Sequence, residues 1–404
     1  MGIELEKIEC IESRIISIYL GLSLVLSTIL GKYISKISNL FILIIFVSLF
    51  IYRKKIRKKR IDIVVYIYLF FYLSSILEKK DYFVGIKNWL LAFIFLVIIF
   101  QNFKLKNFKL KNFEKQLSIS YKLFIKITFL TTCLGIVFFL LKKNLIFLDQ
   151  IYGVTHYGAT TSVYVNPNTF GLTALTSFML SNILLKIRKN KFYKINIIIQ
   201  IFGVIISKSR TAALGIVIYI LLIIILKKIK KIFKILTIIL VSIITMLYSY
   251  IILLNKTASS NNFFNGRIEL WELGIKIGIK DILGIGTTSK ISEITKTLTN
   301  DNNYIKLIED AGFHNIFIQI FVINGGIGLA CFVYIFYSLI KKYKTFDIEG
   351  HRRDLEVGLY SSGIVMIITN IFESNIFFVS NFMAVCFWSL YCNLDKIIEI
   401  NLGE

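Results

Sequence analysis

Two arginines and one histidine stand out in this chain because their side chains can do chemistry together. Arg210 lies in "SKSRTAAL", Arg267 in "NGRIELW" and His314 in "AGFHNIF", each beside an apolar run. A guanidinium stays charged and binds phosphate oxygens through two parallel N–H groups. An imidazole can accept a proton near neutral pH. The three residues together suit transfer of a group from a diphosphate. The arginines would stabilise the departing diphosphate, and the histidine would deprotonate an acceptor hydroxyl.

The rest of the sequence places these residues at a membrane. Hydrophobic residues make up 56% of the 404-residue chain, and its mean hydropathy is +0.72. Apolar runs long enough to cross about 30 Å of hydrocarbon recur along the whole length. We therefore predict an all-α polytopic membrane protein with about twelve transmembrane helices. They fall near residues 15–31, 37–52, 61–77, 86–101, 123–141, 167–185, 195–207, 210–226, 232–254, 314–340, 357–370 and 375–393.

The charges in the loops predict the orientation of these spans. With the N-terminus inside, the inside loops hold 28 Lys and Arg residues, and the short outside loops hold nine. Positive residues collect on the cytoplasmic side of membrane proteins. The pattern predicts a protein of the cytoplasmic membrane with both termini in the cytoplasm and with Arg210, Arg267 and His314 on the extracytoplasmic face. This topology also accounts for the formal charge of +24, so we expect no nucleic acid partner.

One outside loop, at 255–313, is far longer than the others and divides the chain. Spans 1–9 fall in residues 1–254, and spans 10–12 fall in residues 314–404. The loop carries seven basic and seven acidic residues, so net charge does not set it apart. A long outside loop between membrane spans is where function concentrates. We treat the three parts as one membrane domain.

The first part of this long loop predicts an amphipathic helix. Asn265 would cap the helix, and the "GIG" at 284–286 would end it. A helix of this kind, anchored by a tryptophan, can lie flat at the outer membrane interface. Its expected apolar face consists of Ile268, Trp271, Ile275, Ile279 and Ile282.

Four stretches, taken in order, resemble the O-antigen ligase and polymerase family. They are "YVNPNTFGLTAL" (164–175), "SKSRTAALGIVI" (207–218), "NGRIELWELGIKIGIKDILGIGTTS" (265–289) and "AGFHNIFIQIFVINGGIGL" (311–329). The long outside loop before the last spans fits the same family. The likeness in motifs covers residues 164–330, and the twelve-span layout extends it over the chain.

The resemblance implies a metal-independent, inverting glycosyltransferase of GT-C-like architecture that needs no cofactor. Its donor would be an oligosaccharide carried on undecaprenyl diphosphate, and its acceptor a hydroxyl on a glycan, on lipid A–core or on a protein. Arg210 and Arg267 match the family's diphosphate-binding arginines, and His314 matches its proposed base. Contacts with membrane lipid, a flippase and a chain-length regulator would follow from the same resemblance.

Three further polar residues are predicted to bind substrate. Asn166 and Asn168, in "NPN", either cap the helix that follows or, as the family pattern implies, contact a sugar. Glu373, in "NIFESNIF", lies on a short outside loop. Its carboxylate is either solvated, or orients His314, or accepts a hydrogen bond from a sugar.

Metal binding is not expected from this sequence. Glu309 and Asp310 precede His314, but no Asp-x-Asp motif accompanies them, and a second histidine would join them only if His156 folded over. The cysteines at 10, 133, 331, 386 and 392 have neither metal-type nor Cys-x-x-Cys spacing. We expect no cofactor, no metal and no disulfide framework.

The sequence leaves the reaction partly open. The leading interpretation is a polymerase that joins lipid-linked repeat units into a surface polysaccharide. An O-antigen ligase would use the same donor with lipid A–core as the acceptor, and a third variant would transfer the glycan to a protein hydroxyl. A lipid-linked glycan flippase or transporter is the alternative of a different class. Transporters commonly hold charged groups at mid-membrane, whereas here Lys126 is the main charge inside a span.

Overall fold

The computed structural model describes most of the chain as helices. It describes residues 2–31, 33, 63–79, 82–93, 110–147, 150–155, 158–226, 267–286, 294, 308, 312–341, 351–375 and 381–403. Its helices are α1 (Gly2–Leu26), α3 (Ile63–Lys79), α4 (Tyr82–Phe93), α5 (Leu110–Leu141), α6 (Pro167–Ile187), α7 (Lys191–Ser207), α8 (Arg210–Leu226), α10 (Arg267–Lys280), α13 (Ile316–Lys341), α14 (His351–Thr369) and α15 (Phe382–Gly403).

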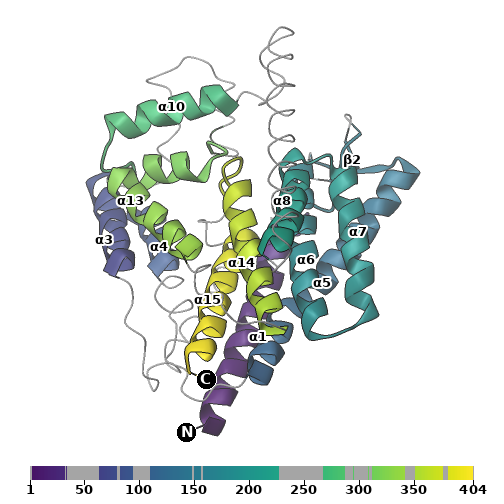
Figure 1. Ribbon diagram of the computed structural model, residues 1–404. Coiled ribbons are helices and arrows are strands. Elements are labelled where there is room, and N and C mark those ends of the chain that lie inside the picture. Colours follow the sequence, from purple (N-terminus) through teal and green to yellow (C-terminus); the bar gives the residue numbers. More distant parts are fainter. Residues whose placement is uncertain are drawn as a thin grey trace.

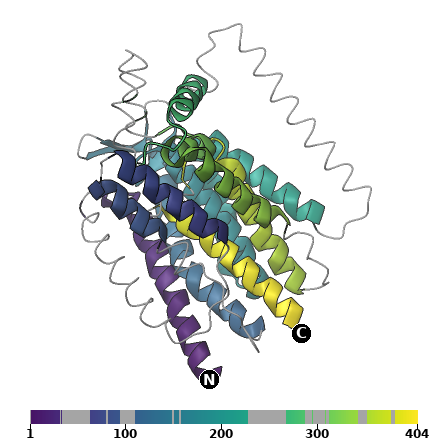
Figure 2. The ribbon, with the colours of Figure 1, turned by 90° about the vertical axis from the view of Figure 1, so that its left-hand side faces the viewer.

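Most of these helices form a bundle, and α10 lies across one end of it (Figure 1). Figure 2 shows the same bundle from the side, with the two termini at the end away from α10. Within the described residues, three helices are long and apolar enough to cross a membrane: α5, α6 and α13. The structure therefore confirms a mostly helical membrane protein but not the count of about twelve spans. The runs predicted at 37–52 and 232–254 lie outside the described residues.

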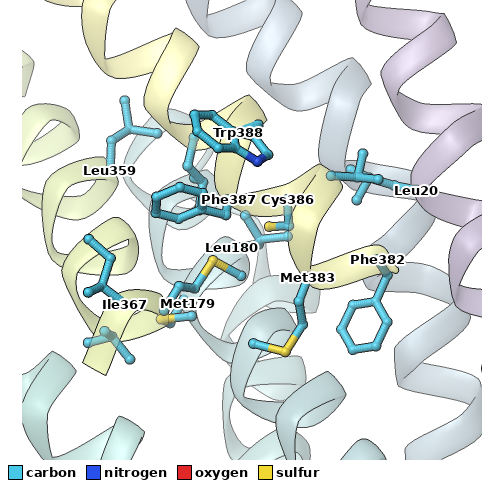
Figure 3. Close-up of a cluster of buried hydrophobic side chains, with 14 of the residues drawn as sticks. Leu20, Met179, Leu180, Leu359, Ile367, Phe382, Met383, Cys386, Phe387 and Trp388 are labelled. Atoms are coloured by element: carbon cyan, nitrogen blue, oxygen red, sulfur yellow. The ribbon is translucent and has the colours of Figure 1, made fainter. Parts of the chain in front are cut away.

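A large hydrophobic core joins α1, α5, α6, α14 and α15. Figure 3 shows part of it, where side chains of α15 meet those of α6 and α14. The residues labelled there are all buried, and they include Cys386, which acts as a small apolar filler. The core fixes how these helices pack against one another.

A ladder of uncharged polar side chains ties α5, α6 and α7 together inside the bundle. Gln200 accepts a hydrogen bond from Thr132 (2.8 Å) and donates one to Asn196 (2.9 Å). Asn196 donates in turn to Ser177 (3.1 Å) and to Ser181 (2.7 Å). All five side chains are buried. Polar pairs of this kind hold helices in register where lipid provides no competing partner.

The prediction of an all-α fold is wrong in one respect. The loop between α5 and α6 forms a three-stranded antiparallel sheet of β1 (Asn144–Phe147), β2 (Gln150–Val154) and β3 (Thr160–Ser162). Gly153, with φ of 90°, adopts a conformation that side chains disfavour, and the register shifts beside it. Thr and aromatic residues favour strands, but these segments are too short for their alternation to be distinguished from a loop.

The helix α13 is broken in its middle, which the sequence did not lead us to expect. Gly325 has φ of 71° and ψ of −174°, a conformation that is essentially restricted to glycine. Three backbone hydrogen bonds of 2.9 Å pair the break with the segment that follows α10. They run from Ile285 N to Val322 O, from Gly286 N to Ile323 O, and from Gly326 N to Ile282 O. The "GIG" stretch is therefore hydrogen-bonded to the break in α13 around "NGG". We call this pairing of residues 282–286 with residues 322–326 the glycine joint.

The helix α10 packs on α13 by one face and leaves the apolar face that was predicted for the membrane interface largely exposed. Gly274 and Gly278 face α13 so closely that an added Cβ would overlap Ile318 at the first position and Phe321 at the second. Its buried apolar residues are Leu270, Leu273 and Ile277. The expected apolar face is exposed at Ile268, Ile275, Ile279 and Ile282. The sequence contains two apolar stripes, and the small glycines decide which one packs inward.

We expect Gly325→Ala to destabilise the protein, because the new Cβ would overlap the Ile282 carbonyl and force a strained backbone. The expected cost is on the order of 1–3 kcal/mol. It should appear as a lower thermal unfolding midpoint of the purified protein in detergent. Gly326→Ala is the matched control, because an added Cβ there meets only Phe321 at 4.0 Å. Equal midpoints for the two variants would contradict the assignment of the joint.

Candidate functional site

The predicted site residues other than Glu373 lie at or beside the starts of helices. Asn168 is in the first turn of α6, Arg210 opens α8, Arg267 opens α10, and His314 precedes α13 by two residues. A helix start carries unpaired N–H groups and the positive end of the helix dipole. Several such starts at one end of the bundle create an environment that favours an anion.

Glu373 joins three of these starts through its carboxylate. Oε1 lies 3.2 Å from Arg267 Nη2, and Oε2 lies 3.4 Å from His314 Nδ1. Asn168 Nδ2 donates to Oε1 over 3.5 Å. The Glu373 side chain is 8% exposed, so the interpretation of this residue as solvated is wrong. Residues from α6, α10, the start of α13 and the end of α14 therefore meet around one carboxylate.

His314 is held in an unusual turn. Its φ of 49° is left-handed, and Gly312 just before it has φ of 66°. The Phe313 N–H donates to the side-chain oxygen of Gln319 (3.1 Å), and this hydrogen bond ties the turn to α13. Asn315 caps α13 by accepting two N–H groups of the first turn (3.0 and 3.3 Å). Non-glycine residues in this conformation are uncommon, and strained backbone of this kind gathers at functional sites.

Asn370 fixes the loop that carries Glu373. Its side-chain Oδ1 accepts from the Asn375 N–H (2.7 Å), and its Nδ2 donates to the Met366 carbonyl (2.8 Å). Its main-chain carbonyl accepts from the N–H of Ile316, the first residue of α13 (3.0 Å). Asn370 is fully buried. One residue thus connects the end of α14, the Glu373 loop and the helix that follows His314.

Arg210 lies beside the start of α6. Gly171, in the second turn of α6, approaches Ser209 so closely that an added Cβ would overlap it. Ser209 contacts the first turn of α8 through its hydroxyl, which accepts from the Ala212 N–H (3.4 Å). Arg210 is exposed, and its role in substrate binding stays a prediction.

The two asparagines of "NPN" differ in what they contact. Asn166 caps α6, because its Oδ1 accepts from the Thr169 N–H (2.7 Å) and hydroxyl (3.0 Å). Asn168 instead contacts Glu373. The structure thus gives Asn166 the capping contact that the sequence left open, and a role for it in sugar binding stays a prediction.

Glu309, Asp310 and His156 lie outside the described residues. Among the residues that are described, no three His, Cys, Asp or Glu side chains come together as a metal site would require. Gln319, Asn370 and the glycine joint were missed in the sequence. The only signals were an Asn-Gly-Gly in the middle of an apolar run and asparagines on both sides of Glu373.

Comparison with known families decides the class of the protein. Residues 195–333 match the family model described as O-antigen ligase. This part of the chain is an O-antigen ligase family domain. The match runs from α7 into α13 and contains Arg210, Arg267 and His314, whereas Asn168 and Glu373 lie before and after it. No curated protein matches the chain. A domain of this family marks an enzyme of glycan transfer at a membrane.

We expect Asn370→Leu to slow glycan transfer more than Asn370→Asp. Leucine removes both side-chain hydrogen bonds of the loop, whereas aspartate keeps an oxygen for the Asn375 N–H. Steady-state transfer rates of the two purified variants at equal protein levels would measure the difference. The positioning role of Asn370 is also tested by introducing Asn370→Leu into the Glu373→Ala variant and comparing the transfer rates of the single and double variants. If Asn370 acts through Glu373, Asn370→Leu adds little in that background. Full additivity of the two changes would contradict the role.

Proposed function

We propose that this enzyme polymerises oligosaccharide repeat units carried on undecaprenyl diphosphate into a surface polysaccharide, at the outer face of the cytoplasmic membrane. The observation that supports the proposal is the contact of Glu373 with both Arg267 and His314. It sets a cation suited to a diphosphate beside a group suited to accepting a proton, and the family of the chain handles lipid-linked glycans.

The proposed reaction is an inverting displacement at the anomeric carbon of the donor. The acceptor hydroxyl forms a bond to that carbon while the bond from the carbon to the diphosphate oxygen breaks. The diphosphate leaves with the electron pair, and the hydroxyl proton passes to His314. Because His314 Nδ1 faces the carboxylate of Glu373, the tautomer with hydrogen on Nδ1 leaves Nε2 as the proton acceptor. This chemistry uses no metal and no cofactor.

The two arginines take the charge of the leaving group. Arg267 and Arg210 open different helices, so they can approach a diphosphate from two sides. The helix starts add partial positive charge in the same region. Donors of this kind, placed where negative charge develops, are typically worth about 3 kcal/mol each in transition-state stabilisation. Asn166 and Asn168 are proposed to contact the sugar.

The proposed topology has both termini in the cytoplasm and the site outside. The loop charges support it, because the loops assigned to the same side of the membrane as the N-terminus hold 28 Lys and Arg residues. The described fold is consistent with it, because the N- and C-termini lie together at the end of the bundle away from α10 (Figure 2). The donor diphosphate would then lie at the extracytoplasmic leaflet, in reach of Arg267.

The acceptor separates the variants of this function. In a polymerase it is the terminal sugar of another lipid-linked glycan, and in an O-antigen ligase it is lipid A–core. Transfer to a protein hydroxyl would use the same donor. Each variant needs the same arginines and histidine, since the donor half of the reaction is common to all. A flippase function would instead require no transfer chemistry. A separate flippase and a chain-length regulator are the proposed protein partners.

Arg210→Ala, Arg267→Ala and His314→Ala should each lower transfer by about a hundredfold or more, because each removes a group that acts on the transition state. Polymer length on a gel, with protein amount measured by immunoblot, would report this in cells. Arg267→Lys should stay impaired because an ammonium lacks the planar fork. Lys189→Ala is the control, since Lys189 is an exposed cation between α6 and α7. Full-length polymer from one site variant would remove that residue from the mechanism.

Purified enzyme given only lipid-linked repeat units should produce a ladder of lengthened products. A ladder on a gel is the polymerase result. Product that forms only when lipid A–core is added would identify a ligase, and product that needs an added protein would identify a protein glycosyltransferase. Absence of turnover with every acceptor, together with movement of labelled donor across vesicle membranes, would show that the protein acts as a transporter and not as a glycosyltransferase.

A further inference from the structure

The carboxylate of Glu373 is shared between two groups with opposite tasks. Arg267, at one oxygen, would bind the negative donor, and His314, at the other, would take up a positive proton. A carboxylate favours the second task because it stabilises an imidazolium. It opposes the first because it already neutralises the guanidinium that the diphosphate needs. One side chain therefore affects donor binding and proton transfer in opposite directions.

The burial of this cluster makes the competition strong. The side chains of Arg267 and Glu373 are 14% and 8% exposed. Charges in such surroundings are weakly screened by salt and solvent. A diphosphate that binds Nη2 of Arg267 must either displace Glu373 Oε1 or place its own negative charge next to it. Like charges at that separation repel, so the carboxylate lowers the affinity of the site for the donor.

We propose that Glu373 is an exchangeable counter-ion: the donor diphosphate takes Arg267 from it, and the carboxylate then acts on His314 alone. This inference rests on the proposed function. It gives donor binding a direct effect on the base, because the carboxylate that leaves the guanidinium keeps its contact with the imidazole. After transfer, the return of Glu373 to Arg267 promotes release of the diphosphate product. Asn168 donates to Glu373 Oε1, the oxygen that faces Arg267, and so keeps the carboxylate near both Arg267 and His314.

The proposal is tested with Glu373→Gln, which keeps the shape and an oxygen acceptor but removes the charge. Binding of inorganic pyrophosphate to the full-length protein in detergent is measured by calorimetry, and transfer kinetics are measured with lipid-linked repeat units. We expect pyrophosphate to bind about tenfold more tightly, because a nearby negative charge is gone. We expect kcat to fall at least tenfold while KM for the donor also falls.

Two controls accompany this variant. Glu269 lies in the first turn of α10, as Arg267 does, but it is not among the residues that contact Glu373. Glu269→Gln should therefore change pyrophosphate binding by less than twofold. Arg267→Gln removes the guanidinium and should abolish most of the binding. Thermal midpoints of all variants are compared with that of the original protein, so that loss of folding is recognised.

Weaker or unchanged pyrophosphate binding by Glu373→Gln would overturn the proposal, since the carboxylate would then only hold Arg267 in place. This outcome leaves the proposed function intact as long as the original protein binds pyrophosphate and transfers glycan. If the original protein does neither, the proposed function fails and this inference fails with it. Tighter binding with a lower kcat supports the exchange.

Discussion

A buried carboxylate that faces a cation and a histidine is the constraint on which this end of the molecule depends. A charge that is removed from water must be paired, or its desolvation cost is not offset. Glu373 meets that requirement with Arg267, which lies 106 residues away in the chain, and with His314, which lies 59 residues away. The two contacts form together only when α10, the turn before α13 and the loop after α14 are all in place. The pairing therefore links correct folding to a complete site.

The surrounding helices provide this placement by close packing and by main-chain hydrogen bonds. The glycines of α10 let that helix approach α13, so that Arg267 and His314 come from neighbouring elements. Asn370 then fixes the Glu373 loop against the first residue of α13. These contacts are short and mostly buried, which leaves little freedom for side chains that must meet within a few tenths of an ångström. The polar ladder inside α5, α6 and α7 similarly holds the helices that lead to Asn168 and Arg210.

The sequence indicated which residues meet at the site better than it indicated how they are held there. Arg267 and His314 stood out because their types are unusual beside apolar runs, and the match to the O-antigen ligase family covers both. Glu373 was left with three interpretations, because nothing local shows whether a short loop folds back on a distant helix. The break at Gly325 was missed because its satisfied hydrogen bonds come from residues about 40 positions earlier. The face by which α10 packs on α13 was not predicted, because isoleucine periodicity does not reveal what glycine permits.

One further consequence follows from the joint between "GIG" and Gly325. The helix α10 and the first half of α13 share their own small hydrophobic cluster, which includes Leu270, Ile277, Phe313 and Val322 and is separate from the main core. This cluster lies within one continuous stretch of chain, from Arg267 to the break. The stretch contains both Arg267 and His314, while Glu373 and Asn168 stay with the bundle. Packing within this stretch holds Arg267 and His314, while Ile316, Ile320 and Ile323 of the same stretch also pack in the main core and so join it to the bundle.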